Sequence, residues 1–254
     1  MHNSPSYFDR AIFILRLKTC TYEFINMPNT ESYVGRTHIT QRMWQEIMGY
    51  NPSEYVGDNM PVVSISYAEI QEFIKRLSTD VDSGEAFHIS FDLLSEYLWE
   101  QVEGTNNNIF VDTKHIFTAG LKSGFSPAKV WSAENSSGRP HEVASLPPNE
   151  FGLYDMYGNV WDMCLDKIYN KDPERLGNES DIEYKRRCIK VRLRNGSITS
   201  GYVLKGGAWN VLKDGYTKDS RILIGANDKF VNAGFRLICE IPKFYIPTSR
   251  FLYK

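Results

Sequence analysis

The sequence lacks any cysteine arrangement that would form a disulfide framework or a zinc site. It has four cysteines, which are far apart and include no Cys-x-x-Cys pair: Cys20, Cys164, Cys188 and Cys239. Small disulfide-rich domains and structural zinc sites both need closely spaced or paired cysteines. We therefore expect free, buried thiols in a reducing compartment.

The sequence also lacks long hydrophobic runs. A membrane-spanning helix needs about 18 or more apolar residues, whereas the apolar run 11–15 stops at Arg16. The N-terminal residues 1–6 are polar and carry no basic stretch of the kind that opens a secretory signal peptide. We expect a protein with no signal peptide or transmembrane helix, located in the cytoplasm or carried outside the cell in a virus particle.

Neither sign of charge predominates, with 29 Lys and Arg against 31 Asp and Glu and a formal net charge of −2. Nucleic acids and anionic membranes usually select a basic excess, so neither is an expected partner. One charged stretch, about residues 165–200, has the character of an insertion and contains a basic cluster at 185–194. A solvated strand of an exposed hairpin at Asn195-Gly196 explains this cluster more simply than a polyanion site does.

The sequence contains enough apolar residues to form a hydrophobic core, since 42% of its 254 residues are hydrophobic. The run 11–17 is rich in β-forming residues and predicts a strand. Thr40 is a suitable N-cap for a helix that ends at Gly49, and Ser66 with Glu69 forms a capping box at the start of a second helix. A further strand is expected at 33–34.

The most informative stretch is 147–162, where a proline-containing turn, apolar residues, an Asp, a glycine turn and a second acidic residue follow one another. Gly158-Asn159 predicts a tight turn, because both residue types tolerate positive φ. Asp155 and Asp162 have two interpretations. Their carboxylates either accept hydrogen bonds that cap this turn or, with carbonyl oxygens of the turn, bind a hard cation.

Five segments, in order along the chain, resemble the motifs of the formylglycine-generating enzyme (sulfatase-modifying factor) family: 33–44, 60–67, 147–162, 205–209 and 232–237. The resemblance extends from about residue 33 to 238, and it places a family helix at 87–101. It implies an α+β fold, C-type-lectin-like, with small twisted antiparallel sheets, two main helices and much irregular structure. It also implies one domain over residues 1–240, followed by an aromatic tail, 241–254, that docks on its own domain, on a partner or on another copy.

The resemblance assigns calcium ligands to Asp155, Gly158 (backbone), Val160 (backbone) and Asp162, so calcium is the implied cofactor. Enzymes of this family oxidise a cysteine of a sulfatase to formylglycine, with copper held by two cysteine thiolates. Residues 206–236, which match the copper-binding segment, contain no cysteine. We therefore expect no copper, and we predict no catalytic residue.

Three positions show the loss of the copper chemistry most clearly. Val211 and Tyr216 or a near neighbour match the two cysteines, and Ala208 stands where the family motif has serine. His141 lies in a further matching segment, 131–143, and has two interpretations, a catalytic base or a structural hydrogen-bonding residue. We favour the structural role, since no nucleophile or metal partner is close to it in sequence.

The sequence thus predicts a pseudoenzyme, a non-catalytic ligand-binding or structural module such as a bacterial or phage recognition protein. Binding proteins with this scaffold use the segment between the two C-terminal motifs as their binding face. The matching residues here are aromatic, amide and charged, a mixture suited to a protein or glycan ligand: Asn210, Val211, Lys213, Asp214, Tyr216, Lys218, Asp219, Asn227, Asp228 and Phe230. The alternative is a metal-dependent enzyme of the same family with altered chemistry, either sulfatase-modifying or maturing a peptide or natural product.

Overall fold

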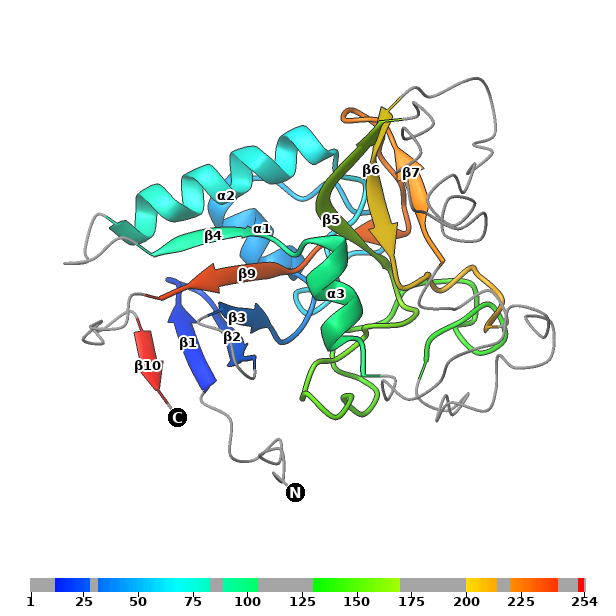
Figure 1. Ribbon diagram of the computed structural model, residues 1–254, viewed down its shortest axis with the longest axis horizontal. Coiled ribbons are helices and arrows are strands. Elements are labelled where there is room, and N and C mark those ends of the chain that lie inside the picture. The colour runs from blue at the N-terminus through cyan, green and yellow to red at the C-terminus, as the bar shows by residue number, and fades with distance from the viewer. Residues whose placement is uncertain are drawn as a thin grey trace, which may run out of the picture.

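The computed structural model describes residues 12–27, 32–82, 89–104, 130–169, 200–213, 220–241 and 251–253. Within these residues the chain forms a six-stranded sheet, a four-stranded sheet and three helices (Figure 1). The strands are β1 (Ile12–Arg16), β2 (Thr21–Asn26), β3 (Ser32–Gly35), β4 (Ser90–Leu93), β5 (Trp161–Tyr169), β6 (Ser200–Lys205), β7 (Ile222–Ile224), β8 (Ala233–Gly234), β9 (Leu237–Glu240) and β10 (Phe251–Tyr253). The helices are α1 (Gln41–Met48), α2 (Tyr67–Asp82) and α3 (Glu96–Val102). The predicted α+β class is confirmed.

The larger sheet has the strand order β10-β1-β2-β3-β9-β4 and is antiparallel throughout. Because side chains alternate along a strand, its two faces contribute to two different apolar cores. Phe13, Leu15 and Phe24 belong to the core that also contains the apolar stripes of α1 and α2. Ile25 and Val34 belong to a second core, shared with α3 and the irregular segment that follows residue 130. The sheet is therefore covered on both faces.

The two predicted helix starts are confirmed in atomic detail. The Thr40 side chain accepts a hydrogen bond from the Met43 amide, and Gly49 ends α1 with φ +84°. At the start of α2, the Glu69 carboxylate accepts from the Ser66 amide at 2.9 Å, while the Ser66 hydroxyl accepts from the Glu69 amide at 3.3 Å. No helix in the described part of the chain is both long enough and apolar enough to span a bilayer.

The prediction of one helix over 87–101 was wrong for its first half. Ser90–Leu93 forms β4, which pairs with β9 so that Leu93 lies opposite Leu237. The helix, α3, starts only at Glu96, where the Ser95 hydroxyl accepts from the Leu98 amide at 3.1 Å. The long-range pairing with β9 outweighs the local helical pattern, because it places the alternating apolar residues of β4 in the core.

The smaller sheet has the order β7-β6-β5-β8 and lies to the right of the larger sheet in Figure 1, with α3 between them. Strands β5 and β6 are antiparallel neighbours, and Tyr169 lies opposite Ser200. The charged stretch predicted at about 165–200 starts within β5 and ends at the first residue of β6. The residues between these strands, 170–199, include the predicted hairpin at Asn195-Gly196 and lie outside the described residues.

Candidate ligand-binding face

A buried polar network joins β5 to α3 and to the segments that precede α1 and β9. Its centre is Asp162 on β5, which is 2% exposed. One carboxylate oxygen, Oδ2, accepts hydrogen bonds from Trp99 Nε1 at 3.0 Å and from Arg236 Nε at 2.9 Å. The other, Oδ1, lies 3.1 Å from His38 Nε2. Trp99 lies on α3, and His38 precedes α1, so the network links elements from most of the chain.

Charge is balanced within this network. Burial raises the pKa of Asp162, but the Arg236 guanidinium, with His38 and Trp99, more than offsets this effect and lowers the pKa to about 2. Arg236 is itself 1% exposed and also donates from Nη2 to the Tyr154 carbonyl at 3.0 Å. A buried ion pair is tolerated when its remaining donors are satisfied in this way.

Asp155, the other predicted side-chain ligand of calcium, also accepts a protein hydrogen bond. Its Oδ2 accepts from the Ala144 amide at 2.9 Å, its φ is +54°, and burial raises its pKa. Val160, a predicted backbone ligand, is 1% exposed. A calcium ion bound to Asp162 would have to compete with Arg236, so these side chains fit the capped-turn interpretation better than a calcium site. No group of three or more His, Cys, Asp or Glu side chains among the described residues is arranged to hold a metal. Calcium binding is therefore implied by the family resemblance alone.

The turn at Gly158 and Asn159 fixes the irregular segments around the network. Gly158 has φ +74°, and a Cβ there would lie 2.3 Å from the Trp131 carbonyl oxygen, so glycine is required. The Asn159 side chain accepts from the His141 amide at 2.9 Å and donates to the His141 carbonyl at 3.1 Å. The Asn159 carbonyl accepts from the Trp209 amide at 2.8 Å. This turn therefore positions the segment that carries Trp209.

The environment of His141 matches the structural interpretation. Its Nε2 lies 2.8 Å from the Ser136 carbonyl oxygen, and its ring stacks on Trp131 with centroids 3.6 Å apart. Trp131 Nε1 in turn donates to the Ser145 hydroxyl at 2.9 Å. The imidazole is thus held in place by neighbouring groups within the loop.

The predicted binding residues are distributed unevenly. Asn210, Asn227, Asp228 and Phe230 are exposed, and Lys213 is half-buried. Asp214, Tyr216, Lys218 and Asp219 lie outside the described residues. Val211 is half-buried and packs against both apolar cores, so it anchors its loop to the interior instead of offering its side chain to a ligand.

Sequence analysis missed several exposed apolar side chains in the same region. Leu212 is 63% exposed and Val231 is 41% exposed. Tyr55 and Val56, from the loop between α1 and α2, are 37% and 80% exposed. Nothing in their local sequence distinguishes them from core residues, because exposure depends on how distant loops come together.

Three loops form one surface, which we call the loop face and define as residues 54–57, 209–213 and 226–232. Asn232 Nδ2 donates to Asn210 Oδ1 at 2.8 Å and so joins the second loop to the third. The Tyr55 ring packs edge-on against Trp209 with centroids 6.4 Å apart, which joins the first loop to the second.

Gln41 is a buried residue that organises the first loop and that sequence analysis did not single out. It is 2% exposed and lies at the first position of α1. Its Nε2 donates to the carbonyls of Tyr55 and Pro61, and its Oε1 accepts from Asn51 Nδ2 and the Gly57 amide. All four hydrogen-bonding positions of this amide are therefore used.

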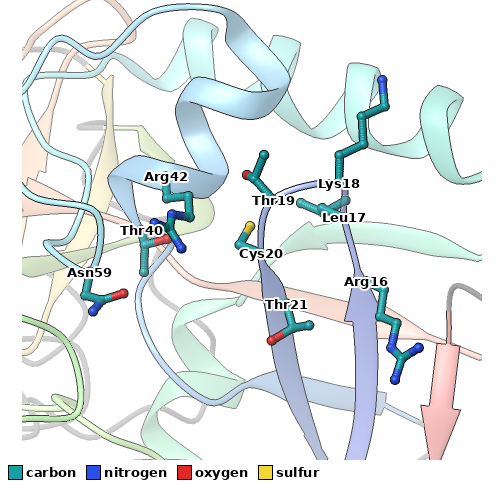
Figure 2. Close-up of a pocket in the computed structure, with 9 residues that line it drawn as sticks. All are labelled: Arg16, Leu17, Lys18, Thr19, Cys20, Thr21, Thr40, Arg42 and Asn59. Atoms are coloured by element: carbon teal, nitrogen blue, oxygen red, sulfur yellow. The ribbon is translucent and has the colours of Figure 1, made fainter.

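A shallow cavity of about 500 Å³ lies apart from the loop face, between the β1–β2 turn and the start of α1 (Figure 2). Although three basic residues line it, Figure 2 shows Arg16 and Lys18 extending away from the centre, and Arg42 forms an ion pair with Asp58. Burial, followed by the charge of Glu46, raises the pKa of the Cys20 thiol to about 11, which keeps it protonated and unreactive. The cavity therefore offers neither a concentrated charge nor a nucleophile.

Two small sheets, short helices and long irregular segments fixed by buried polar groups define a C-type-lectin-like fold of the formylglycine-generating-enzyme type, as predicted. Comparison with family models gives the same answer. The chain belongs to the family of the sulfatase-modifying factor enzyme 1-like domain, whose model matches residues 13–241.

The chain is also similar to several individual proteins. Variable protein 1 of Treponema denticola aligns with a TM-score of 0.64 and 21% identity, over 90% of this chain and 98% of that one. PvdO from Pseudomonas aeruginosa aligns with a TM-score of 0.55 and 17% identity, over 91% of each chain. Chaperone protein LppX of Paenibacillus barcinonensis is 23% identical over 196 residues, which are 62% of this chain and 69% of LppX. The two structural similarities show the fold alone.

Proposed function

We propose that this protein is a non-catalytic binding module whose loop face takes a protein ligand. The observation that carries the proposal is the gathering of exposed apolar side chains on three linked loops. Leu212 is 63% exposed, Phe230 40% and Val231 41%. Single exposed apolar residues are ordinary, but a group of them on loops held together by hydrogen bonds and ring contacts is typical of an interaction site.

The chemistry of the loop face favours a protein ligand over a glycan. Aliphatic side chains provide much of its exposed apolar surface, and amide and charged residues lie among them: Asn210, Asn227, Asp228 and Lys229. An apolar centre within a polar rim is the usual anatomy of a protein interface. The similarity to a protein described as a chaperone supports the same choice, because chaperones bind other polypeptides.

The proposal that the module is non-catalytic rests on the residues that replace the copper ligands. Residues 206–236 contain no cysteine. Val211, which matches one of the two cysteines, packs against the apolar cores, and its side chain has no atom that binds a metal. A copper(I) site needs soft thiolate or thioether ligands, and this segment has neither cysteine nor methionine.

The test uses two probes, a displayed random-peptide library and a glycan array, each presented to the full chain. Three proteins are compared: wild type, a Leu212→Ser/Phe230→Ser variant, and a Tyr97→Ser control that changes a 71% exposed aromatic on α3. We expect peptides selected on wild type to bind the control equally and to lose at least about tenfold in affinity for the loop-face variant.

Three results would overturn the proposal. Selected peptides that bind the loop-face variant as well as wild type would place the binding site elsewhere. Binding to glycans with no peptide selected would replace the protein ligand by a carbohydrate. Copper-dependent oxygen consumption with a cysteine-containing peptide would show an enzyme.

A further inference from the structure

The strand β10 lies at one edge of the larger sheet and has β1 as its neighbour. The pair is antiparallel, with Phe13 opposite Tyr253, Ile14 opposite Leu252 and Leu15 opposite Phe251. β10 thus covers the outer edge of β1. Of the aromatic tail expected from the sequence, residues 251–253 thus pair with the tail's own sheet in this structure.

The edge that β10 covers is of a kind that pairs readily with another chain. The residues of β1 before Arg16 are Ile12-Phe13-Ile14-Leu15, a continuous apolar run with strong β-propensity. An apolar strand left at the edge of a sheet presents unpaired backbone groups as a template for a further strand. The pairing with β10 therefore keeps the β1 edge from pairing with strands of other molecules.

The cover itself is short. β10 has three residues, and residues 242–250 connect it to the core of the domain. A strand added through so few backbone hydrogen bonds opens far more often than the domain unfolds.

We propose that the β1 edge is an interaction surface for a second copy of this chain, whose residues 251–253 replace the protein's own in a reciprocal exchange. The replacing strand has the same sequence and makes the same register with β1, so the exchange loses no contact of the pair. Two copies related by a twofold axis would satisfy both edges at once. Protein concentration therefore sets the balance between the two forms.

The first test uses cysteine cross-linking in the full chain. Ile14→Cys and Leu252→Cys place thiols at opposed positions of the β1–β10 pair. A chain with both substitutions should form an intramolecular disulfide at low concentration. A mixture of the two single variants gives a disulfide-linked heterodimer whose yield rises with protein concentration, and neither single variant alone gives this product.

The second test changes the tail and leaves the core intact. Consecutive amide N–H groups of a strand point to opposite sides, so one of the two at positions 252 and 253 faces β1. Proline has no N–H group, and Leu252→Pro with Tyr253→Pro therefore removes the donor that faces β1. Sedimentation velocity of wild type shows a dimer fraction that grows with concentration. The double proline variant loses that reciprocal dimer.

Three outcomes would overturn the proposal. The mixed single cysteine variants could give no heterodimer at concentrations where the double variant cross-links within one chain. This result would show that residues 251–253 pair only with β1 of their own chain. The double variant could form no cross-link at all, which would remove the β1–β10 pair. A dimer that persists unchanged in the double proline variant would not be built from exchanged tails.

Discussion

Asp162→Ala removes the carboxylate that Arg236, Trp99 and His38 share in the buried network. The structure predicts a large loss of stability, because Arg236 is 1% exposed and would keep its charge without a counter-charge. Removing one partner of a buried ion pair typically costs about 3–5 kcal/mol. Domains have total unfolding free energies of about 5–15 kcal/mol, so this single change removes a large part of the stability.

The assay is thermal and urea unfolding followed by tryptophan fluorescence. At about 2–4 °C per kcal/mol for a domain of this size, the midpoint of thermal unfolding falls by about 6–20 °C. The double variant Asp162→Leu/Arg236→Met removes both charges together and should be more stable than Asp162→Ala, since no isolated charge remains in the core.

A matched control separates the buried pair from ion pairs in general. Arg76 Nε and Glu72 Oε1 lie 2.7 Å apart on the surface of α2, with side chains 49% and 43% exposed. Glu72→Ala should leave the midpoint almost unchanged, because exposed pairs are screened by solvent. If Asp162→Ala lowered the midpoint no more than Glu72→Ala, the network would not stabilise the fold as we infer.

Stability should also depend on pH through the same carboxylate. The pKa of Asp162 falls from the ordinary 3.8 to about 2 on folding, which corresponds to a stabilisation of about 2 kcal/mol. Because the folded-state pKa is the lower one, this contribution is present above the unfolded value and is lost as pH falls from about 5 to about 2. Asp162→Asn should lose this part of the acid dependence in urea titrations, and an unchanged slope would contradict the reasoning.

The remaining predictions concern the turn, the first loop and calcium. Gly158→Ala should destabilise the fold by about 3 kcal/mol or more. The control Gly138→Ala should cost about 1 kcal/mol, because Gly138 has a similar φ, +73°, but no atom within 4 Å of an added Cβ. Equal losses of stability in urea unfolding would exclude steric contact as the cause. Gln41→Leu should cost about 2–4 kcal/mol and speed proteolysis within 51–57, since it leaves the partners of the buried amide unsatisfied. Millimolar calcium should leave the thermal midpoint at its value in EDTA, and a rise of several degrees would establish a calcium site in the turn 155–162.

Local features of the fold were predictable from sequence, because their partners are close along the chain. The cap at Thr40 and the capping box at Ser66 and Glu69 each involve residues three positions apart. The first strand was predicted from its apolar run alone. The fold class, in contrast, came from the ordered motifs of the family, since no local pattern specifies how strands are arranged in a sheet.

Features that depend on distant contacts were predicted poorly. Asp162 binds Arg236, which is 74 positions away along the chain, and Trp99, which is 63 positions away. The sequence therefore identified the Asp162 carboxylate but not its partners, and left both interpretations of its role open. Strand β4 was taken for helix because its pairing partner, β9, lies far along the chain. Leu212 and Val56 were missed because their exposure follows from the way the three loops meet.

The most direct test of the account is hydrogen–deuterium exchange of the full chain with and without a saturating peptide selected on it. The account predicts slower exchange at residues 209–213 and 226–232, with a smaller effect at 54–57. Protection confined to other segments, such as the lining of the cavity near the β1–β2 turn, would contradict the assignment of the loop face as the binding site.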